Sequence, residues 1–147
     1  PELGLLQKTK KLETAFIAFS PVGRGLLTDK PPTPERVKES PFLKVNPRFL
    51  EPNLSENIKA VKGFQKLAKD YGLSTAGLAI AWLIAKDEHI IPIPGTRSTI
   101  HLKEMVKGTE KNLTQTDIDE IEKTLPVGWA HGDRYSDIQW IGPERYC

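Results

Sequence analysis

The sequence has 147 residues, which is enough for one ordinary domain with a single hydrophobic core. Hydrophobic residues make up 38% and charged residues 27%, a balance that suits a soluble globular chain better than a disordered tail or a membrane protein. The net charge of +2 comes from interspersed acids and bases, which argues against nucleic-acid binding, and no apolar run approaches the ~20 residues of a membrane-spanning helix.

The N-terminus and the cysteine content bear on the cellular compartment. Cys147 is the one cysteine, so neither an internal disulfide nor a zinc site is expected, and a reducing, cytoplasmic compartment fits. The chain starts at Pro1 without a charged segment followed by an apolar one, so no secretory signal is expected in the residues shown.

The first residues predict a short helix followed by a buried strand. Apolar and basic residues alternate loosely between Leu3 and Leu12, which favours a helix within residues 1–13. Phe16–Phe19 is a compact apolar run rich in strand-forming residues, and we therefore expect a strand that is covered on both faces.

A long loop is expected after this strand. The segment Ser20–Gly25 contains one proline and two glycines, which permit a tight turn and the close approach of another group. Six prolines then interrupt any regular element up to about Asn53, so residues 15–53 should hold the strand and the loop. A loop of this length in a compact domain is commonly a lid or a binding segment.

Residues 54–87 predict two helices of different character. In the first, apolar residues recur every three or four positions with lysines between them, and Gly72 ends the segment. Ser74 or Thr75 is expected to cap the second helix, Ala76–Ala85, whose nearly continuous apolar sequence predicts deep burial.

Residues 90–125 predict a second strand and two further helices. Ile90–Ile93 is a short apolar run that predicts a strand. Pro94–Ser98 is a turn that leads from this strand into a helix, and Gly108 is placed to end that helix. For the last helix, Thr114 is the expected N-cap, Asp117 is the acid of a capping box, and Leu113 is expected to pack on Ile118. Residues 126–147 contain scattered aromatic residues and are interpreted as an ordered tail.

The order of strand, loop, two helices, strand, loop and helix predicts an α/β protein with parallel strands. Two strands cannot form a closed sheet, and strands that are apolar on both faces normally have neighbours on both sides. Either partner strands lie outside this chain or the core is unusually open. Exposed strand edges also suggest self-association or a partner chain.

Both strands end in glycine-containing turns, and ligands of α/β proteins bind at the carboxyl ends of strands. Gly95–Ser98 leads directly into a helix, so free backbone N–H groups and the guanidinium of Arg97 predict an anion site. The alternative is an ordinary strand-to-helix turn in which Ser98 only caps the helix and Arg97 is solvated. The turn with Gly23 and Gly25 is a weaker signal, because it lacks the third glycine of a dinucleotide fingerprint.

Two segments resemble a known family. Phe16–Thr28, FIAFSPVGRGLLT, and Ile91–Arg97, IPIPGTR, are similar to the seventh and eighth strand-and-loop segments of aldo-keto reductases, NADP(H)-dependent (β/α)8 TIM barrels. The similarity extends through Asn46–Phe49, the helix ending at Leu83, and Glu104. It implies that residues 1–147 form a single partial barrel domain, from the helix before the seventh strand to the C-terminus.

The resemblance also implies a set of cofactor-binding residues. The pyrophosphate of NADP(H) would lie along the first loop, at Ser20, Val22, Gly23 and Arg24. The adenosine 2′-phosphate would approach the second loop at Gly95, Thr96 and Arg97, and Glu104 would contact the adenine. Ser98 and His101, at the start of the helix that follows, are also assigned to cofactor binding. The sequence departs from the family at Met105, where asparagine is usual and a core role is expected, and at His101, where arginine is common and a surface position is expected.

Members of the family reduce aldehydes and ketones by hydride transfer from the nicotinamide, while a tyrosine assisted by lysine, histidine and aspartate supplies the proton. The matching positions fall before the start of this sequence, so no residue of the chain is assigned a catalytic role. Three hypotheses remain: a part of a reductase completed by another polypeptide and acting on a small carbonyl substrate, a non-catalytic nucleotide-binding remnant, and an interaction protein.

Overall fold

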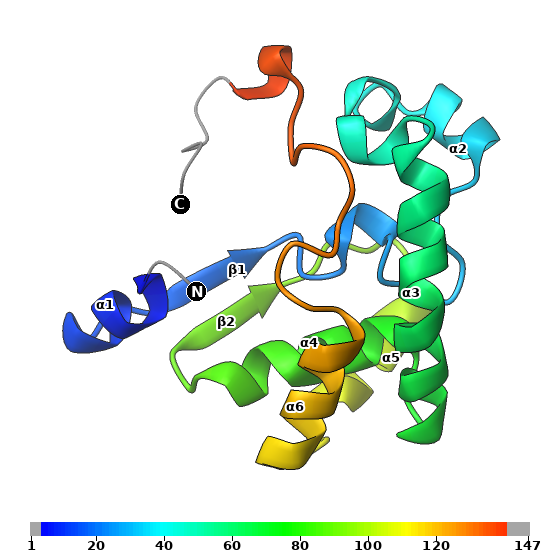
Figure 1. Cartoon of the computed structure of the whole chain (residues 1–147). Helices are drawn as coiled ribbons and strands as arrows, with labels where there is room; N and C mark the ends of the chain where they lie inside the picture. The colour runs from blue at the N-terminus through cyan, green and yellow to red at the C-terminus, as the bar shows by residue number, and fades with distance from the viewer. Residues whose placement is uncertain (1–3, 141–147) are drawn as a thin grey trace.

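The computed structural model describes residues 4–140 and shows an α/β arrangement around two parallel strands (Figure 1). β1 (Phe16–Phe19) pairs with β2 (Ile90–Ile93), with Phe16 opposite Ile90 and Phe19 opposite Ile93. The predictions of both strands and of their parallel direction are therefore confirmed.

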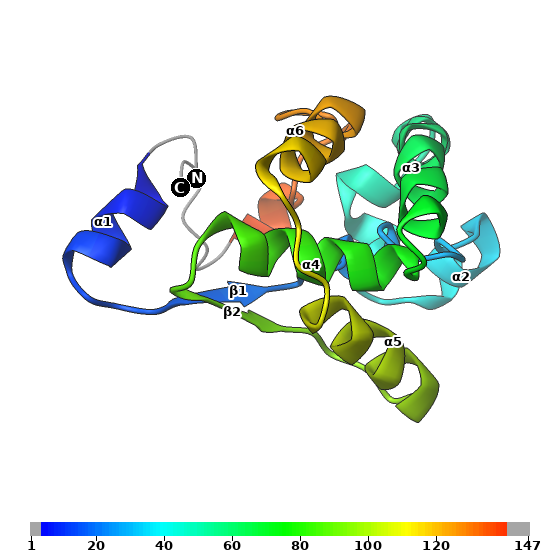
Figure 2. The ribbon, with the colours of Figure 1, turned by 90° about the horizontal axis from the view of Figure 1, so that it is seen from below.

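Helix α4 lies at the centre of the packing, against β2 on one side and α3, α5 and α6 on the others (Figure 2). This position explains its nearly all-apolar sequence, since Leu78–Ala81 are all buried. The α-helices of the described residues are α1 (Leu5–Lys11), α2 (Pro34–Glu39), α3 (Asn53–Asp70), α4 (Thr75–Lys86), α5 (Thr99–Thr109) and α6 (Gln115–Thr124). None of the helices in residues 4–140 combines the length and the apolar character that crossing a bilayer would need.

The two faces of the sheet differ in their cover. On one face, Ala18 and Ile90 are buried against Leu6 of α1, with Phe16 and Leu83 packed at the edge of this cluster. On the other face the side chains are about half exposed: Ile17 50%, Phe19 50%, Ile91 49% and Ile93 50%. The described part of the chain thus covers only one face, contrary to the expectation of strands buried on both.

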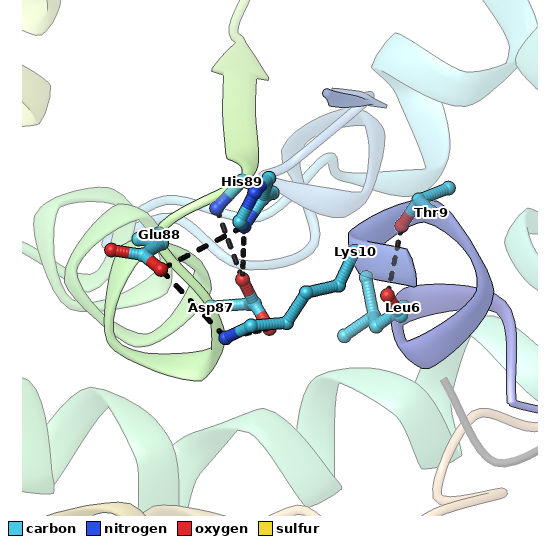
Figure 3. A network of polar contacts seen from close by, with 6 residues as sticks. All are labelled: Leu6, Thr9, Lys10, Asp87, Glu88 and His89. Atoms are coloured by element: carbon cyan, nitrogen blue, oxygen red, sulfur yellow. Dashed lines mark hydrogen bonds and ion pairs between the residues drawn. The ribbon is translucent and has the colours of Figure 1, made fainter. Parts of the chain in front are cut away.

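A polar network ties α1 to the turn between α4 and β2, at the amino end of the strands (Figure 3). The Lys10 ammonium lies 3.7 Å from Asp87 Oδ2 and 3.7 Å from Glu88 Oε1. Asp87 Oδ1 accepts a hydrogen bond from the backbone N–H of His89 and lies 3.0 Å from its ring Nδ1, and these contacts lower the pKa of Asp87. Since the predicted ligand loops leave the opposite end of the strands, we assign this network to stability.

Ser74 is the N-cap of α4, which decides between the two expected candidates. Its Oγ accepts a hydrogen bond of 3.0 Å from the backbone N–H of Gly77. Thr75 is instead fully buried, and both its N–H and its hydroxyl donate to the carboxylate of Asp29. This pair joins the long loop to the start of α4.

Glycine at position 108 serves close helix packing. The prediction that Gly108 ends its helix is wrong, because α5 continues to Thr109 and Gly108 is buried inside it. A Cβ atom at position 108 would overlap the backbone of Gly77 on α4, so these two helices approach each other backbone to backbone. Two glycines facing each other allow this approach, which no larger residue would.

Helix α6 begins as the sequence predicts. The Thr114 side chain accepts from the backbone N–H of Asp117, and the Asp117 carboxylate accepts from the backbone N–H of Thr114 at 2.7 Å, which completes the capping box. Asp117 also accepts a hydrogen bond of 2.7 Å from the Tyr71 hydroxyl, at the end of α3. Hydrogen bonds from Thr114 and then from Tyr71 lower the pKa of Asp117.

This lowered pKa predicts an acid-sensitive contribution to stability. A carboxylate with a depressed pKa stabilises the fold above its unfolded pKa and loses that effect as the pH falls through the folded value. We expect Asp117→Asn to lower the urea midpoint at about pH 7 and to differ less from wild type at about pH 2.5. Asp119→Asn, on the exposed side of α6, is the control, and an equal difference at both pH values would contradict the assignment.

The long loop between β1 and α3 contains more regular structure than its prolines indicate. The expectation that they interrupt every element is wrong, because two of them begin one: Pro34 starts α2 after the Thr33 cap, and Pro47 starts the 3₁₀ helix η3 (Pro47–Phe49) after the Asn46 cap. Proline is favourable at the first helical position, where its missing N–H costs nothing. Four apolar residues of the loop pack with Leu54 at the start of α3 into a separate cluster: Leu26, Val37, Leu43 and Phe49.

The tail is ordered as predicted over residues 126–140. Fully buried Asn57 donates to the carbonyl oxygens of Arg48 (2.9 Å) and His131 (3.0 Å) and accepts from the N–H of His131 (2.7 Å). Fully buried Asn46 donates to the carbonyl oxygen of Arg134 (2.8 Å) and to the side chain of Gln139 (3.2 Å). These two amides hold the tail against the long loop, whereas residues 1–3 and 141–147 lie outside the described part.

Candidate functional site

The two predicted ligand loops emerge at the same edge of the sheet, because they follow adjacent parallel strands (Figure 1). The first loop forms the 3₁₀ helix η1 (Gly23–Gly25), which begins three residues after Ser20. Its backbone visits the left-handed region at two residues other than glycine, Ser20 (φ 52°) and Arg24 (φ 57°). Such conformations are uncommon and concentrate at ligand-binding sites, which is consistent with the prediction for this loop.

The Arg24 side chain is held between aromatic rings. Its guanidinium carbon lies 4.6 Å from the ring centroid of Tyr135 and 5.0 Å from that of Phe42, and its Nη1 donates to the carbonyl oxygen of Arg134 at 3.2 Å. Burial lowers the pKa of Arg24, with a smaller lowering from the charge of Arg134 and an opposing effect of Tyr135. The left-handed backbone conformation of Arg24 and these contacts together fix the position of its guanidinium group.

A small cavity of ≈ 100 Å³ lies beside this loop. Three arginines from separate parts of the chain line it: Arg24 from the first loop, Arg48 from η3, and Arg134 from the tail. The other lining residues are Phe19, Ser20, Gly23, Leu26, Phe49 and Trp129. The cavity therefore brings together three of the predicted residues, namely Ser20, Gly23 and Arg24, while Val22 supplies backbone support through the carbonyl that accepts from Gly25 N–H at 3.0 Å.

The second loop is separate from this cavity and open to solvent. Gly95, Thr96 and Arg97 are exposed, and the Arg97 side chain has no hydrogen-bond or ion-pair partner among residues 4–140. Within that same range the backbone N–H groups of Arg97, Thr99 and Ile100 have no acceptor either. A guanidinium and three free N–H donors at the start of an 11-residue helix suit an anion.

The remaining predicted residues lie on the first turns of α5. Ser98 is the N-cap, and its Oγ accepts from the backbone N–H of His101 at 3.4 Å. His101 is exposed and Glu104, one turn further, is partly exposed, so both side chains are accessible beside the second loop. Met105 is only 4% exposed, which confirms that it packs in the core.

Sequence reasoning did not identify Arg48 and Arg134 as site residues. Arg48 lies in the stretch quoted for the family resemblance, and no pattern links it to the tail. Arg48 and Arg134 meet at the cavity only in the folded chain, because the buried side-chain amides of Asn46 and Asn57 bind the tail to the long loop.

The two tyrosines among residues 4–140 each contact other side chains of the fold. Tyr71 is the C-cap of α3 and its hydroxyl donates to Asp117; burial and this hydrogen bond raise its pKa above the usual range. Tyr135 is buried between Phe42 and Trp140, with ring centroids at 6.4 and 5.1 Å. Tyr146 lies outside the described residues. Among residues 4–140 there is also no group of three or more potential metal ligands.

The chain is similar in sequence to several curated proteins over most of its length. Aldo-keto reductase yakc of Schizosaccharomyces pombe, whose name specifies NADP(+), is 28% identical over 135 residues, covering 92% of this chain and 40% of that protein. Probable aldo-keto reductase 1 of Glycine max is 32% identical over 126 residues, covering 86% of this chain and 36% of the relative. The chain thus spans about 40% of the length of the curated relatives it matches.

The structural comparison agrees in fold. A solved thermostable aldo-keto reductase in complex with the inhibitor epalrestat superposes with a TM-score of 0.55 at 23% identity, over 82% of this chain and 33% of that one. A model of the aldo/keto reductase family matches residues 1–126, which include both strands and both loops. The chain therefore belongs to the aldo-keto reductase family.

Proposed function

We propose that this chain is the cofactor-binding, C-terminal part of a (β/α)8 barrel reductase that converts aldehydes or ketones to alcohols with NADPH. The observation that carries the proposal is the pair of loops at one sheet edge, each of which presents an arginine. Active sites of such barrels lie at the carboxyl ends of the strands, and phosphate groups bind at the last two loops.

Each loop has a role in this proposal. The proposed role of Ser20, Val22, Gly23 and Arg24 is to line the cofactor pyrophosphate. The position of the Arg24 guanidinium at the cavity, between its aromatic neighbours, supports this role. Gly95–Ser98 binds the adenosine 2′-phosphate, because Arg97 and the free N–H groups of α5 are unpaired and accessible in the described structure. His101 and Glu104 lie beside them and would border the adenosine.

The bare sheet face supports a barrel that is completed by further strands. Its four half-exposed apolar side chains would be buried by the inner residues of neighbouring strands, as in the layered interior of a barrel. The chain covers 40% of one relative and 36% of another. The part of those relatives that this chain does not match is long enough to supply the further strands and a proton donor. When bound, the cofactor supplies the hydride, and the residues of this chain hold and orient it.

Titration of the purified chain with NADP⁺ and with NAD⁺ tests the proposal. We expect Arg97→Gln to weaken NADP⁺ binding about tenfold or more, since a charge-assisted hydrogen bond contributes ~1.5–3 kcal/mol, and to leave NAD⁺ binding unchanged because NAD⁺ lacks the 2′-phosphate. Isothermal titration calorimetry measures both, with the exposed Arg36→Gln as the matched control. Equal NADP⁺ affinity in wild type and Arg97→Gln, or no NADP⁺ binding, would refute it.

The same preparation separates cofactor binding from catalysis. With NADPH and an aldehyde, the isolated chain is expected to show no carbonyl-dependent NADPH oxidation. Activity should appear only after addition of a polypeptide that carries the remaining strands and the proton donor. NADPH oxidation by the chain alone would show that these 147 residues contain a proton donor and would contradict this assignment.

A further inference from the structure

Three guanidinium groups meet at the ≈ 100 Å³ cavity, and only Arg24 belongs to the predicted cofactor loop. Arg48 comes from η3, and its Nε donates to the carbonyl oxygen of Gly132 at 3.3 Å. Arg134 comes from the tail, and its guanidinium carbon lies 4.8 Å from the ring centroid of Phe19 and 5.5 Å from that of Tyr135. The tail thus brings a third charge to a pocket that the loops alone would leave with two.

These side chains are held in place and still have free donors. Asn46 fixes the backbone at Arg134 through its carbonyl oxygen, and Arg24 donates one N–H to the same oxygen. A guanidinium has five N–H donors; Arg24 bonds to the Arg134 carbonyl oxygen and to the Tyr135 side chain, and Arg48 uses one donor for the Gly132 carbonyl oxygen. Most donors at the cavity are therefore available to a ligand.

The positive charge at the cavity has little compensation within the described chain. Among residues 4–140 no carboxylate lies within ion-pair distance of these three guanidinium groups. Burial lowers the pKa of Arg48, the charges of Arg24 and Arg134 lower it further, and only Asp133 opposes this effect. Like charges gathered in a partly buried pocket repel one another, and a bound anion would remove that penalty.

We propose that Arg48 and Arg134 complete, with Arg24, an oxyanion-binding pocket that the C-terminal tail closes. Arginine is suited to this task because its planar fork binds phosphate or carboxylate oxygens in pairs. Two sources share this chemistry: the pyrophosphate of the cofactor and the carboxylate of a small carbonyl acid. The assignment to either source rests on the proposed function, whereas oxyanion binding itself does not.

Calorimetric titration of the full chain with inorganic pyrophosphate at constant ionic strength tests the pocket. We expect Arg134→Gln and Arg48→Gln each to weaken pyrophosphate binding about tenfold or more, whereas Arg36→Gln, on the exposed side of α2, leaves it unchanged. Arg134→Lys keeps the positive charge but loses the planar guanidinium, so we expect a smaller loss of pyrophosphate affinity than in Arg134→Gln. This variant replaces Arg134→Gln in the test if Arg134→Gln does not fold. Absence of pyrophosphate binding, or equal binding by wild type and the Arg134 variants, overturns the proposal.

Parallel titrations with NADP⁺ and with pyruvate identify the source of the anion. Loss of NADP⁺ affinity in Arg134→Gln assigns the pocket to the cofactor. Loss of pyruvate affinity with unchanged NADP⁺ affinity assigns it to a substrate carboxylate. If NADP⁺ fails to bind while pyrophosphate binding still depends on Arg134, the result contradicts the proposed function and supports the oxyanion pocket.

Discussion

Gly108→Ala is expected to destabilise the chain by about 3 kcal/mol or more, because the added methyl group would overlap the backbone of Gly77. A side chain can rotate away from such a clash, whereas two packed helix backbones can only separate. Separation of α4 and α5 would open the packing around Met105 and shift the helix that carries Ser98 and His101. For a chain of this size, the loss corresponds to a fall in melting temperature of about 10 °C.

Gly63→Ala is the matched control. Gly63 also lies inside a helix, α3, and a Cβ atom there would meet only the side-chain methyl of Thr124 at 3.2 Å. Because alanine favours a helix over glycine by about 1 kcal/mol, Gly63→Ala should be neutral or stabilising. Thermal and urea denaturation followed by circular dichroism compare the two. A Gly108→Ala variant as stable as Gly63→Ala would mean that α4 and α5 do not approach as closely as described.

Asn57→Ala should cost about 2–3 kcal/mol and release the tail from the long loop. It removes three hydrogen bonds and leaves the N–H and C=O of His131 and the C=O of Arg48 without their partner. The amide protons of residues 129–136 should then exchange faster with solvent, which hydrogen-exchange mass spectrometry measures. Pyrophosphate affinity should fall as well, since Arg134 is carried by the released segment.

Asn112→Ala, at an exposed position between α5 and α6, provides the comparison for this variant. It should leave both stability and exchange of the tail unchanged. Unchanged exchange in Asn57→Ala would show that Asn46 and the arginine contacts hold the tail by themselves.

Much of the fold follows from local sequence patterns. The strands, the long helix α3, the apolar helix α4 and the capping box of α6 each depend on residues within a few positions of one another, so periodicity and cap chemistry predict them. Gly108 is a residue whose role local sequence patterns do not predict. A glycine near the end of a helix suggests a terminus, and only the approach of α4, 31 residues earlier at Gly77, gives it a different role.

The candidate site divides in the same way. The second loop is predictable because a glycine turn between a strand and a helix is a local feature, and Arg97 is indeed accessible beside it. The three-arginine cavity is not predictable, because it depends on Asn46 and Asn57, two polar residues whose burial no hydrophobic pattern reveals. Their amide groups bond to backbone atoms of a distant segment, and such partners leave no trace in the residue types.

The attachment of the tail through its peptide groups has an evolutionary consequence. Asn57 binds the N–H and C=O of His131, which every residue other than proline possesses, while the His131 side chain itself points to solvent. Selection is therefore free to exchange the side chain at position 131 across related enzymes, provided that the asparagine on α3 and the spacing to Arg134 persist.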